Sequence, residues 1–143
     1  MRADVLLVFT ALFGSSAAFR RSCRKSGEGE GWYYTTNSDT LEAVAADFCT
    51  KPSVIQQWNH LTTLKPGVNI KVPCRYNAGK QRDCRKNTAT DGAYVIVSGD
   101  MLKDIAYDFC TNSDVLQRMN SAKIPNKDLI FPNTVIQVPC SWN

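Results

Sequence analysis

The chain has 143 residues and a formal net charge of +4, with 17 basic residues, 13 acidic residues and one histidine. A charge this small indicates a solvated basic surface rather than a nucleic-acid footprint. Beyond residue 18, no apolar run is long enough to cross a membrane. We therefore expect neither a nucleic acid nor a membrane as a partner.

The first 18 residues predict a secretory signal peptide. A basic residue precedes an apolar run from Val5 to Phe13, and small residues follow it up to Ala18. The run is about half the length that a membrane span requires, and its flanks are typical of an Ala-type cleavage site. We expect an extracellular protein, free or associated with a cell wall. The sequence leaves open whether Arg20 and Arg21 form a processing site or are solvated charges.

The cysteines are even in number and lie far apart in the sequence. In a short secreted chain this pattern indicates disulfides. Zinc sites usually have closely spaced ligand pairs, whereas the nearest cysteines here are Cys74 and Cys84. We expect no metal and no cofactor. We expect disulfides from all six: Cys23, Cys49, Cys74, Cys84, Cys110 and Cys140.

The chain contains an internal repeat. A shift of 61 residues places the sequence DFCT at Asp47–Thr50 on the same sequence at Asp108–Thr111. Nearer the end of each copy, Ile70–Cys74 aligns with Ile136–Cys140 at a shift of 66. The second copy therefore has five extra residues, and an insertion of this kind belongs in a surface loop.

Each copy predicts a strand, two helices and a second strand, which makes the fold class α+β in two tandem βααβ modules. The first strands are expected at 33–36 and 94–97, where β-branched and aromatic residues dominate. The second strands are expected at 69–72 and 135–138, each ending at a Val-Pro-Cys sequence.

Polar residues mark the expected starts of the helices. The first helix of each copy follows Asp39 or Asp100, and its apolar residues recur at i, i+3, i+4 and i+7. The second helix follows Ser53 or Ser113. Aspartate and serine both suit the N-cap position, so we expect them to cap these helices.

Trp58 and Met119 occupy equivalent positions in the second helices of the two copies. Both fall on the apolar face of their helix, so we expect both to pack in the core.

Three cysteines in each copy require at least one disulfide between the copies. If the two strands are antiparallel, the end of the second lies beside the start of the first, and the first helix returns toward the same end. On this basis we predict the pairs Cys49–Cys74, Cys110–Cys140 and Cys23–Cys84.

The sequence contains no arrangement typical of a hydrolase. A glycosidase needs two carboxylates that flank one bond, and Asp39 and Asp100 are instead explained as helix caps. His60, the single histidine, has no serine or cysteine nucleophile as a partner. We expect a binding protein and not an enzyme.

Four stretches resemble the LysM family. In the second copy, YVIVSGDMLKDIA (Tyr94–Ala106) is similar to the opening of a LysM module, and NKDLIFPNTVIQVPC (Asn126–Cys140) to its end. In the first copy, SDTLEAVA (Ser38–Ala45) and LKPGVNIKVPC (Leu64–Cys74) match the same two regions. The resemblance covers most of the chain after the signal peptide.

The resemblance implies modules at 32–74 and 93–140, joined by a linker at 75–92. LysM modules bind glycans that contain N-acetylglucosamine, and secreted fungal LysM effectors bind and shield chitin oligosaccharides. We expect chitin oligosaccharide binding without catalysis. The sequence leaves open peptidoglycan or another N-acetylglucosamine glycan, a small secreted cell-wall hydrolase or inhibitor, and a dimer that forms around one oligosaccharide.

The resemblance places the glycan site between two loops of each module. The first-strand-to-helix loops contribute Asn37, Ser38, Asp39 and Thr40, and Ser98, Gly99, Asp100 and Met101. The loops before the second strand contribute Asn59, His60, Leu61 and Leu64, and Asn120, Ile124, Leu129, Ile130 and Phe131. Ser38 replaces a family glycine and Met101 a threonine, so we expect unequal modules. Trp32 and Trp142 lie at the edges of the modules, and the sequence leaves open whether they are packing residues or sugar contacts.

Overall fold

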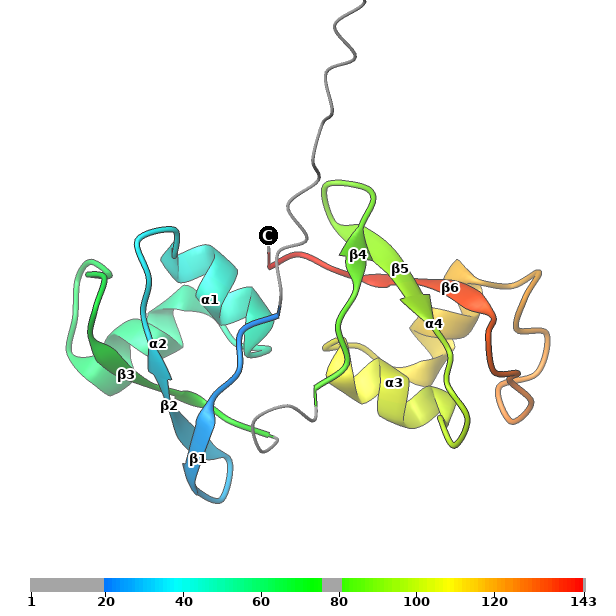
Figure 1. Cartoon of the computed structure of the whole chain (residues 1–143), viewed down its shortest axis with the longest axis horizontal. Coiled ribbons are helices and arrows are strands. Elements are labelled where there is room, and N and C mark those ends of the chain that lie inside the picture. Colours follow the sequence, from blue (N-terminus) through cyan, green and yellow to red (C-terminus); the bar gives the residue numbers. More distant parts are fainter. Residues whose placement is uncertain (1–19, 76–80, 143) are drawn as a thin grey trace, which may run out of the picture.

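The computed structural model describes residues 20–75 and 81–142, which form two modules of the same architecture (Figure 1). Module 1 consists of β1 (Arg24–Gly27), β2 (Glu30–Tyr34), α1 (Leu41–Asp47), α2 (Pro52–Asn59) and β3 (Asn69–Pro73). Module 2 consists of β4 (Arg85–Lys86), β5 (Asp91–Val95), α3 (Leu102–Asp108), α4 (Ser113–Met119) and β6 (Val135–Pro139). The expected signal peptide lies outside the described residues. None of the described helices has the length and apolar character of a membrane span.

Each module contains an antiparallel three-stranded sheet, ordered β1-β2-β3 in module 1 and β4-β5-β6 in module 2. Two helices pack against each sheet, so the expected α+β class and βααβ core are confirmed. The edge strands β1 and β4 are additional. Both lie outside the module boundaries expected from the sequence, and β4 lies within the segment expected to be a linker.

The first strands begin earlier than predicted because each contains a glycine that the β-propensity pattern does not favour. A Cβ atom on Gly31 would lie 2.6 Å from the Arg24 carbonyl oxygen and 2.7 Å from the Cys74 sulfur. Gly92 is similarly confined by Arg85 and Cys140. Glycine is therefore required at these positions, because the disulfide and the edge strand occupy the space of a side chain.

The disulfides are Cys23–Cys74, Cys84–Cys140 and Cys49–Cys110. The predicted pairing was wrong, although the expectation of a bridge between the copies holds for Cys49–Cys110. The physical reason is the additional edge strand. Because β1 pairs with β2, and β2 with β3, the start of β1 and the end of β3 lie on either side of one glycine, and a disulfide spans the sheet there.

The two cores consist of sheet residues and the inner faces of the helices. In module 1 the Tyr33 and Phe48 rings lie 5.5 Å apart. In module 2 Trp142 is 1% exposed and stacks on Phe109, so it is a packing residue. Met119 is partly buried against the core, as expected.

Trp58 does not pack as predicted: it is 36% exposed. The helix α2 has only eight residues and buries Ile55 as its contact with the core, which leaves the position of Trp58 at the margin of the apolar face.

The helix caps differ from the prediction by one or two residues. Thr40 caps α1 by accepting a hydrogen bond from the Ala43 amide, and Asn112 caps α4 by accepting one from the Val115 amide. Lys51 and Met101 occupy the N-cap positions of α2 and α3 without a side-chain hydrogen bond. Asp39, Asp100, Ser53 and Ser113 are therefore not the caps. The two aspartates bind other donors.

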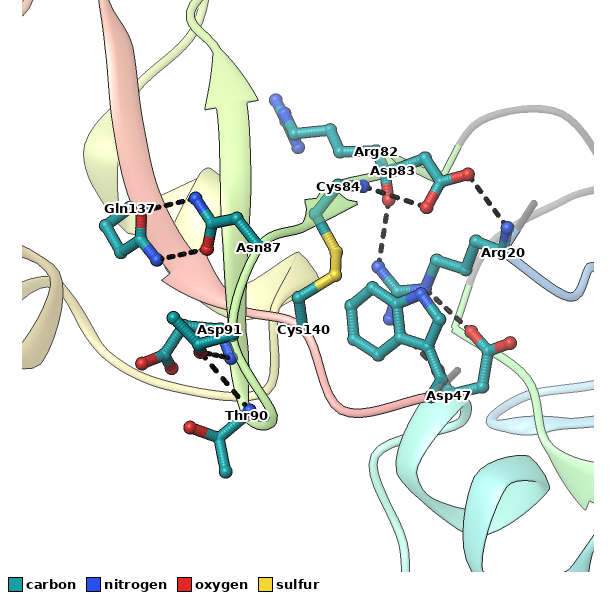
Figure 2. Close-up of a disulfide and its surroundings, with 12 residues drawn as sticks. Arg20, Asp47, Arg82, Asp83, Cys84, Asn87, Thr90, Asp91, Gln137 and Cys140 are labelled. Atoms are coloured by element: carbon teal, nitrogen blue, oxygen red, sulfur yellow. Dashed lines mark hydrogen bonds and ion pairs between the residues drawn. A yellow bond between two sulfur atoms is a disulfide. The ribbon is translucent and has the colours of Figure 1, made fainter. Parts of the chain in front are cut away.

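Arg20 lies buried between the modules, with a side chain that is 4% exposed. Its Nε donates to Asp47 Oδ1 over 3.0 Å, and its Nη1 donates to the Arg82 carbonyl oxygen over 3.0 Å (Figure 2). The guanidinium carbon lies 4.2 Å from the centre of the Trp142 ring, which is a cation–π contact. Together with Cys49–Cys110, this arginine holds the two modules against each other.

The side chains of Arg20 and Arg21 are bonded to the protein rather than solvated, so the structure does not support the alternative of two solvated charges. Arg21 donates from its backbone amide to Asp47 Oδ2 over 2.7 Å and from its side chain to the Trp142 carbonyl oxygen over 2.9 Å. The expectation of a solvated basic surface is wrong for these two residues and for Arg82.

The confinement of Gly31 generates a prediction about stability. Gly31→Ala should lower the free energy of unfolding by about 1–3 kcal/mol, because the new methyl group overlaps the β1 backbone and the Cys23–Cys74 bridge. Urea unfolding under non-reducing conditions measures this loss. Gly27→Ala is the matched control, since a methyl group on Gly27 would have no atom within 4 Å. Equal stability of the two variants would contradict the disulfide arrangement.

The position of Arg20 generates a second prediction. Gln81 is the counterpart of Arg20 in the repeat, so Arg20→Gln is the natural test substitution. We expect a loss of about 1–3 kcal/mol, because Asp47 stays buried and keeps only Arg21 of its two arginine partners. Small-angle scattering should also show a wider distribution of module orientations. Arg24→Gln, on an exposed strand, should change neither measurement; an unchanged Arg20→Gln profile would exclude the locking role.

Candidate functional site

A groove lies between the two predicted loops of module 2. It encloses about 480 Å³, and we call it the interloop groove. Its lining residues are Asp100, Met101, Leu102, Lys103, Ser113, Lys127, Asp128 and Ile130. The structure thus brings together Asp100 and Met101 from the predicted first loop with Ile130 from the predicted second loop.

The five extra residues of module 2 supply one wall of this groove. Lys127 forms an ion pair with Asp114, and the Pro125 carbonyl oxygen accepts a hydrogen bond from Gln117, so the loop is attached to α4 at two points. The lining also contains five residues that were not predicted from the sequence: Leu102, Lys103, Ser113, Lys127 and Asp128. The insertion itself was the signal that pointed to this loop.

Apolar side chains are exposed at the rim of the groove. Met101 is 50% exposed, and Leu129 and Phe131, on either side of Ile130 in the chain, are 54% and 59% exposed. The equivalent residues of module 1 are Thr40, Thr63 and Lys65. Module 2 therefore presents apolar surface where module 1 presents polar surface.

Asp100 holds the first loop of module 2 in place. Its Oδ2 accepts hydrogen bonds from the Tyr94 hydroxyl (2.6 Å) and the Val97 amide (3.0 Å), and its Oδ1 pairs with Arg82 over 2.9 Å. Burial alone would raise the pKa of Asp100, but the hydrogen bonds and the arginine outweigh it, so the pKa lies below its ordinary value. Burial and the hydrogen bond to Asp100 raise the pKa of Tyr94 to about 12.

Asp39 has the same role in module 1. It accepts from the Tyr33 hydroxyl and the Thr36 amide, each over 2.7 Å, and pairs with Arg21 over 2.8 Å. Burial again opposes ionisation, and the three donors again lower the pKa of Asp39 below its ordinary value. Both aspartates are thus loop anchors whose oxygens are already occupied.

Asn59 and Asn120 connect the second helices to the last strands. The Asn120 side chain donates to the carbonyl oxygens of Leu116 and Gln137 and accepts from the Gln137 amide over 2.7 Å. Asn59 makes the equivalent bonds to Ile55 and Lys71. The structure therefore gives the two predicted site asparagines a framework position.

The other predicted residues fall into two groups. Ile124 is 1% exposed and belongs to the core of module 2, while Leu61 and Leu64 are partly buried against the core of module 1. The exposed positions are Asn37, Ser38, Thr40, His60, Ser98 and Gly99.

Ser38 replaces the glycine of the family motif without backbone strain. Gly99 has a φ of 90°, whereas Ser38 is not among the described non-glycine residues with positive φ. The first loop of module 1 thus follows a different path, which its serine can adopt without cost.

A second hollow lies beside the first loop of module 1. It encloses about 350 Å³ and is lined by Tyr34, Thr35, Thr36, Asn37, Pro66 and Gly67. Asn37 is the one predicted site residue in this lining. Among the described ranges, 20–75 and 81–142, no three His, Cys, Asp or Glu side chains are grouped as metal ligands.

The anchoring of Asp100 generates a prediction on pH. Because its folded pKa is lowered, its contribution to stability is complete above about pH 3.9 and disappears as the pH falls through the folded value. Asp100→Asn should cost about 2 kcal/mol at pH 7, and much less near pH 2. Thermal unfolding at both pH values measures this. Glu28→Gln, the same change on an exposed turn, should show no such dependence; a loss that persists at low pH would contradict the ionic role.

The chain is similar to known proteins over its whole length. It is 56% identical over 147 aligned positions to the "Secreted LysM effector Vd2LysM" of Verticillium dahliae, and the alignment covers 100% of both chains. The LysM domain family matches residues 33–73 and 94–139.

Two solved structures are also similar. The Bacillus cereus spore cortex-lytic enzyme SleL is 18% identical with a TM-score of 0.32, covering 78% of this chain and 23% of that one. The ectodomain of a receptor-like kinase is 22% identical with a TM-score of 0.29, covering 78% and 56%. TM-scores this low add nothing to the family assignment. From the family match and the full-length relative, it follows that the chain belongs to the LysM domain family and contains two copies of the domain.

Proposed function

We propose that the protein is a secreted, non-catalytic chitin-binding protein that sequesters chitin oligosaccharides or shields wall chitin. The observation that carries the proposal is the interloop groove of module 2, which joins the two loops named by the LysM resemblance. Secretion is supported by the signal peptide expected at residues 1–18 and by the name of the Verticillium relative.

The charges of the groove favour a neutral ligand. Lys127 is paired with Asp114 and Asp100 with Arg82, which leaves Lys103 and Asp128 as opposite charges in the lining. A neutral acetamido sugar needs apolar surface for its methyl and ring faces and a few polar groups to orient it. Met101 and Ile130 supply that apolar surface, which supports chitin over the anionic glycan peptidoglycan.

The electrostatics of the groove support binding without hydrolysis. A glycosidase needs a protonated carboxylic acid with a raised pKa beside a second carboxylate. The pKa of Asp100 is lowered instead, and both of its oxygens accept hydrogen bonds from the protein. This carboxyl group is therefore poorly suited to donate a proton to a leaving group.

The two modules are proposed to bind unequally. Module 1 lacks the five residues that form one wall of the groove, and it has Thr40 and Glu42 where module 2 has Met101 and Lys103. Module 2 is therefore the principal groove site. Dimerisation around one oligosaccharide stays a prediction, and size-exclusion chromatography with and without a chitin hexamer tests it.

Met101 offers the sharpest test of the groove. Met101→Asp removes apolar surface and adds a charge, while aspartate at the N-cap of α3 favours the helix. We expect it to weaken binding of a chitin hexamer on the order of tenfold in isothermal titration. Thr40→Asp is the matched control, because it places the same residue at the N-cap of α1 in module 1. It should have a smaller effect.

Three outcomes would contradict the proposal. Equal effects of the two substitutions would remove the assignment to module 2. Retention on peptidoglycan with no retention on insoluble chitin would change the ligand class. Release of reducing sugar from chitin by the purified protein would show that it is an enzyme.

A further inference from the structure

We infer that module 1 contacts the glycan through the outer face of its sheet, at Trp32 and Tyr34. We call these two residues the aromatic strip. The inference rests on the proposed function and extends it: an N-acetylglucosamine chain would continue from the loops of module 1 onto β2. No residue of the strip belongs to the interloop groove.

The strip is formed by alternate residues of one strand. Trp32 and Tyr34 are two positions apart in β2, so both side chains point to the same face, about 7 Å apart along the strand. They are 38% and 60% exposed, whereas Tyr33 between them is buried in the core. Two adjacent aromatic rings are thus held by the sheet in an exposed position.

Hollows on both sides of Tyr34 connect the strip with the loops. One, of about 330 Å³, is lined by Trp32, Tyr34, Asn69 and residues 22–24. The other, of about 350 Å³, is lined by Tyr34, Asn37, Gly67 and their neighbours. The Tyr34 hydroxyl lies directly beside Gly67, since a Cβ there would be 3.5 Å from it. The surface is therefore continuous from Trp32 to the first loop.

The chemistry of the strip suits the flat face of a sugar ring. The face of an aromatic ring carries partial negative charge and attracts the polarised C–H groups of a pyranose, while the Tyr hydroxyl and Trp N–H can bind its hydroxyl groups. Lys71, which pairs with Trp32 across the sheet, is neutralised by Glu30 over 2.9 Å. Arg24, which pairs with Trp32 from β1, is exposed, so one cation also lies beside the strip.

Module 2 does not have this surface. The equivalents of Trp32 and Tyr34 are Ala93 and Val95, which have no ring faces. On the same face, the Asn87 and Gln137 side chains bond to each other over 2.7 Å and 3.2 Å (Figure 2). The sheet framework is shared by both modules, so the aromatic residues are not required by the fold.

The test compares chitin oligosaccharides of different length. In the full-length secreted protein, Trp32→Ala/Tyr34→Ala should leave the affinity for a chitin trimer unchanged and weaken that for an octamer on the order of tenfold. Trp32→Phe/Tyr34→Phe keeps an aromatic ring at both positions and should retain most of the octamer affinity. Val95→Ala, at the position in module 2 that matches Tyr34, should change neither. Circular dichroism and thermal unfolding establish that each variant folds.

Several results would overturn the inference. If the native protein binds chitin and the folded double alanine variant keeps its octamer affinity, the strip is not a contact surface and the proposed function stands. If the native protein binds no chitin, the proposed function fails as well. If the strip mediates a glycan-independent dimer that the double variant abolishes, its occupant is a second copy. If the double variant does not fold, the same comparison of trimer and octamer affinity is made with Tyr34→Ala alone.

Discussion

In each module, one arginine is held between two aspartates, and the geometry of the binding loops depends on this contact. Arg82 pairs with Asp100 and Asp108, as Arg21 does with Asp39 and Asp47. The arginine precedes the edge strand, the first aspartate fixes the first loop, and the second ends the first helix. Because the aspartates are almost fully buried, removal of the arginine leaves Asp39 or Asp100 buried without its cationic partner. The contact thus ties three segments together in modules too small to depend on a core alone.

Arg20 and the Cys49–Cys110 disulfide hold module 1 against module 2. The disulfide joins the ends of α1 and α3, and the guanidinium group of Arg20 packs near it against Trp142. Two binding surfaces in a fixed relation bind one long polymer with less loss of freedom than two surfaces on a flexible linker. Under the proposed function, two glycan-binding surfaces in a fixed arrangement would suit one long chitin chain better than short fragments.

The sequence predicted the parts of the fold that follow from periodicity. Leu41, Val44, Ala45 and Phe48 lie at helical spacing, and the helix forms there because that face must be buried. The edge strands could not be predicted in this way, because β1 reads RKSG and has no apolar face. Without β1, the position of Cys23 beside Cys74 could not be inferred, and the disulfide pairing failed. The family resemblance named the two loops that line the groove of module 2, but individual residues such as Asn120 bond to the framework, which spacing alone does not reveal.

The two modules differ at exposed positions that the fold does not constrain. Three features recur in both copies: the arginine–aspartate contacts, the hydrogen bonds of Asn59 and Asn120 to the last strands, and the glycines beside the disulfides. Each of them either satisfies a buried polar group or avoids a steric overlap. The exposed positions at the rim of the groove and on the outer face of the sheet are not constrained by the fold in this way. Single exposed apolar side chains are common on protein surfaces, but a group of adjacent ones that the fold does not require is informative about ligands. The exposed apolar side chains of module 2 include Met101, Leu129 and Phe131 at the loops, and those of module 1 include Trp32 and Tyr34 on the sheet. The two copies thus share one scaffold and differ in the surfaces that we propose contact a glycan.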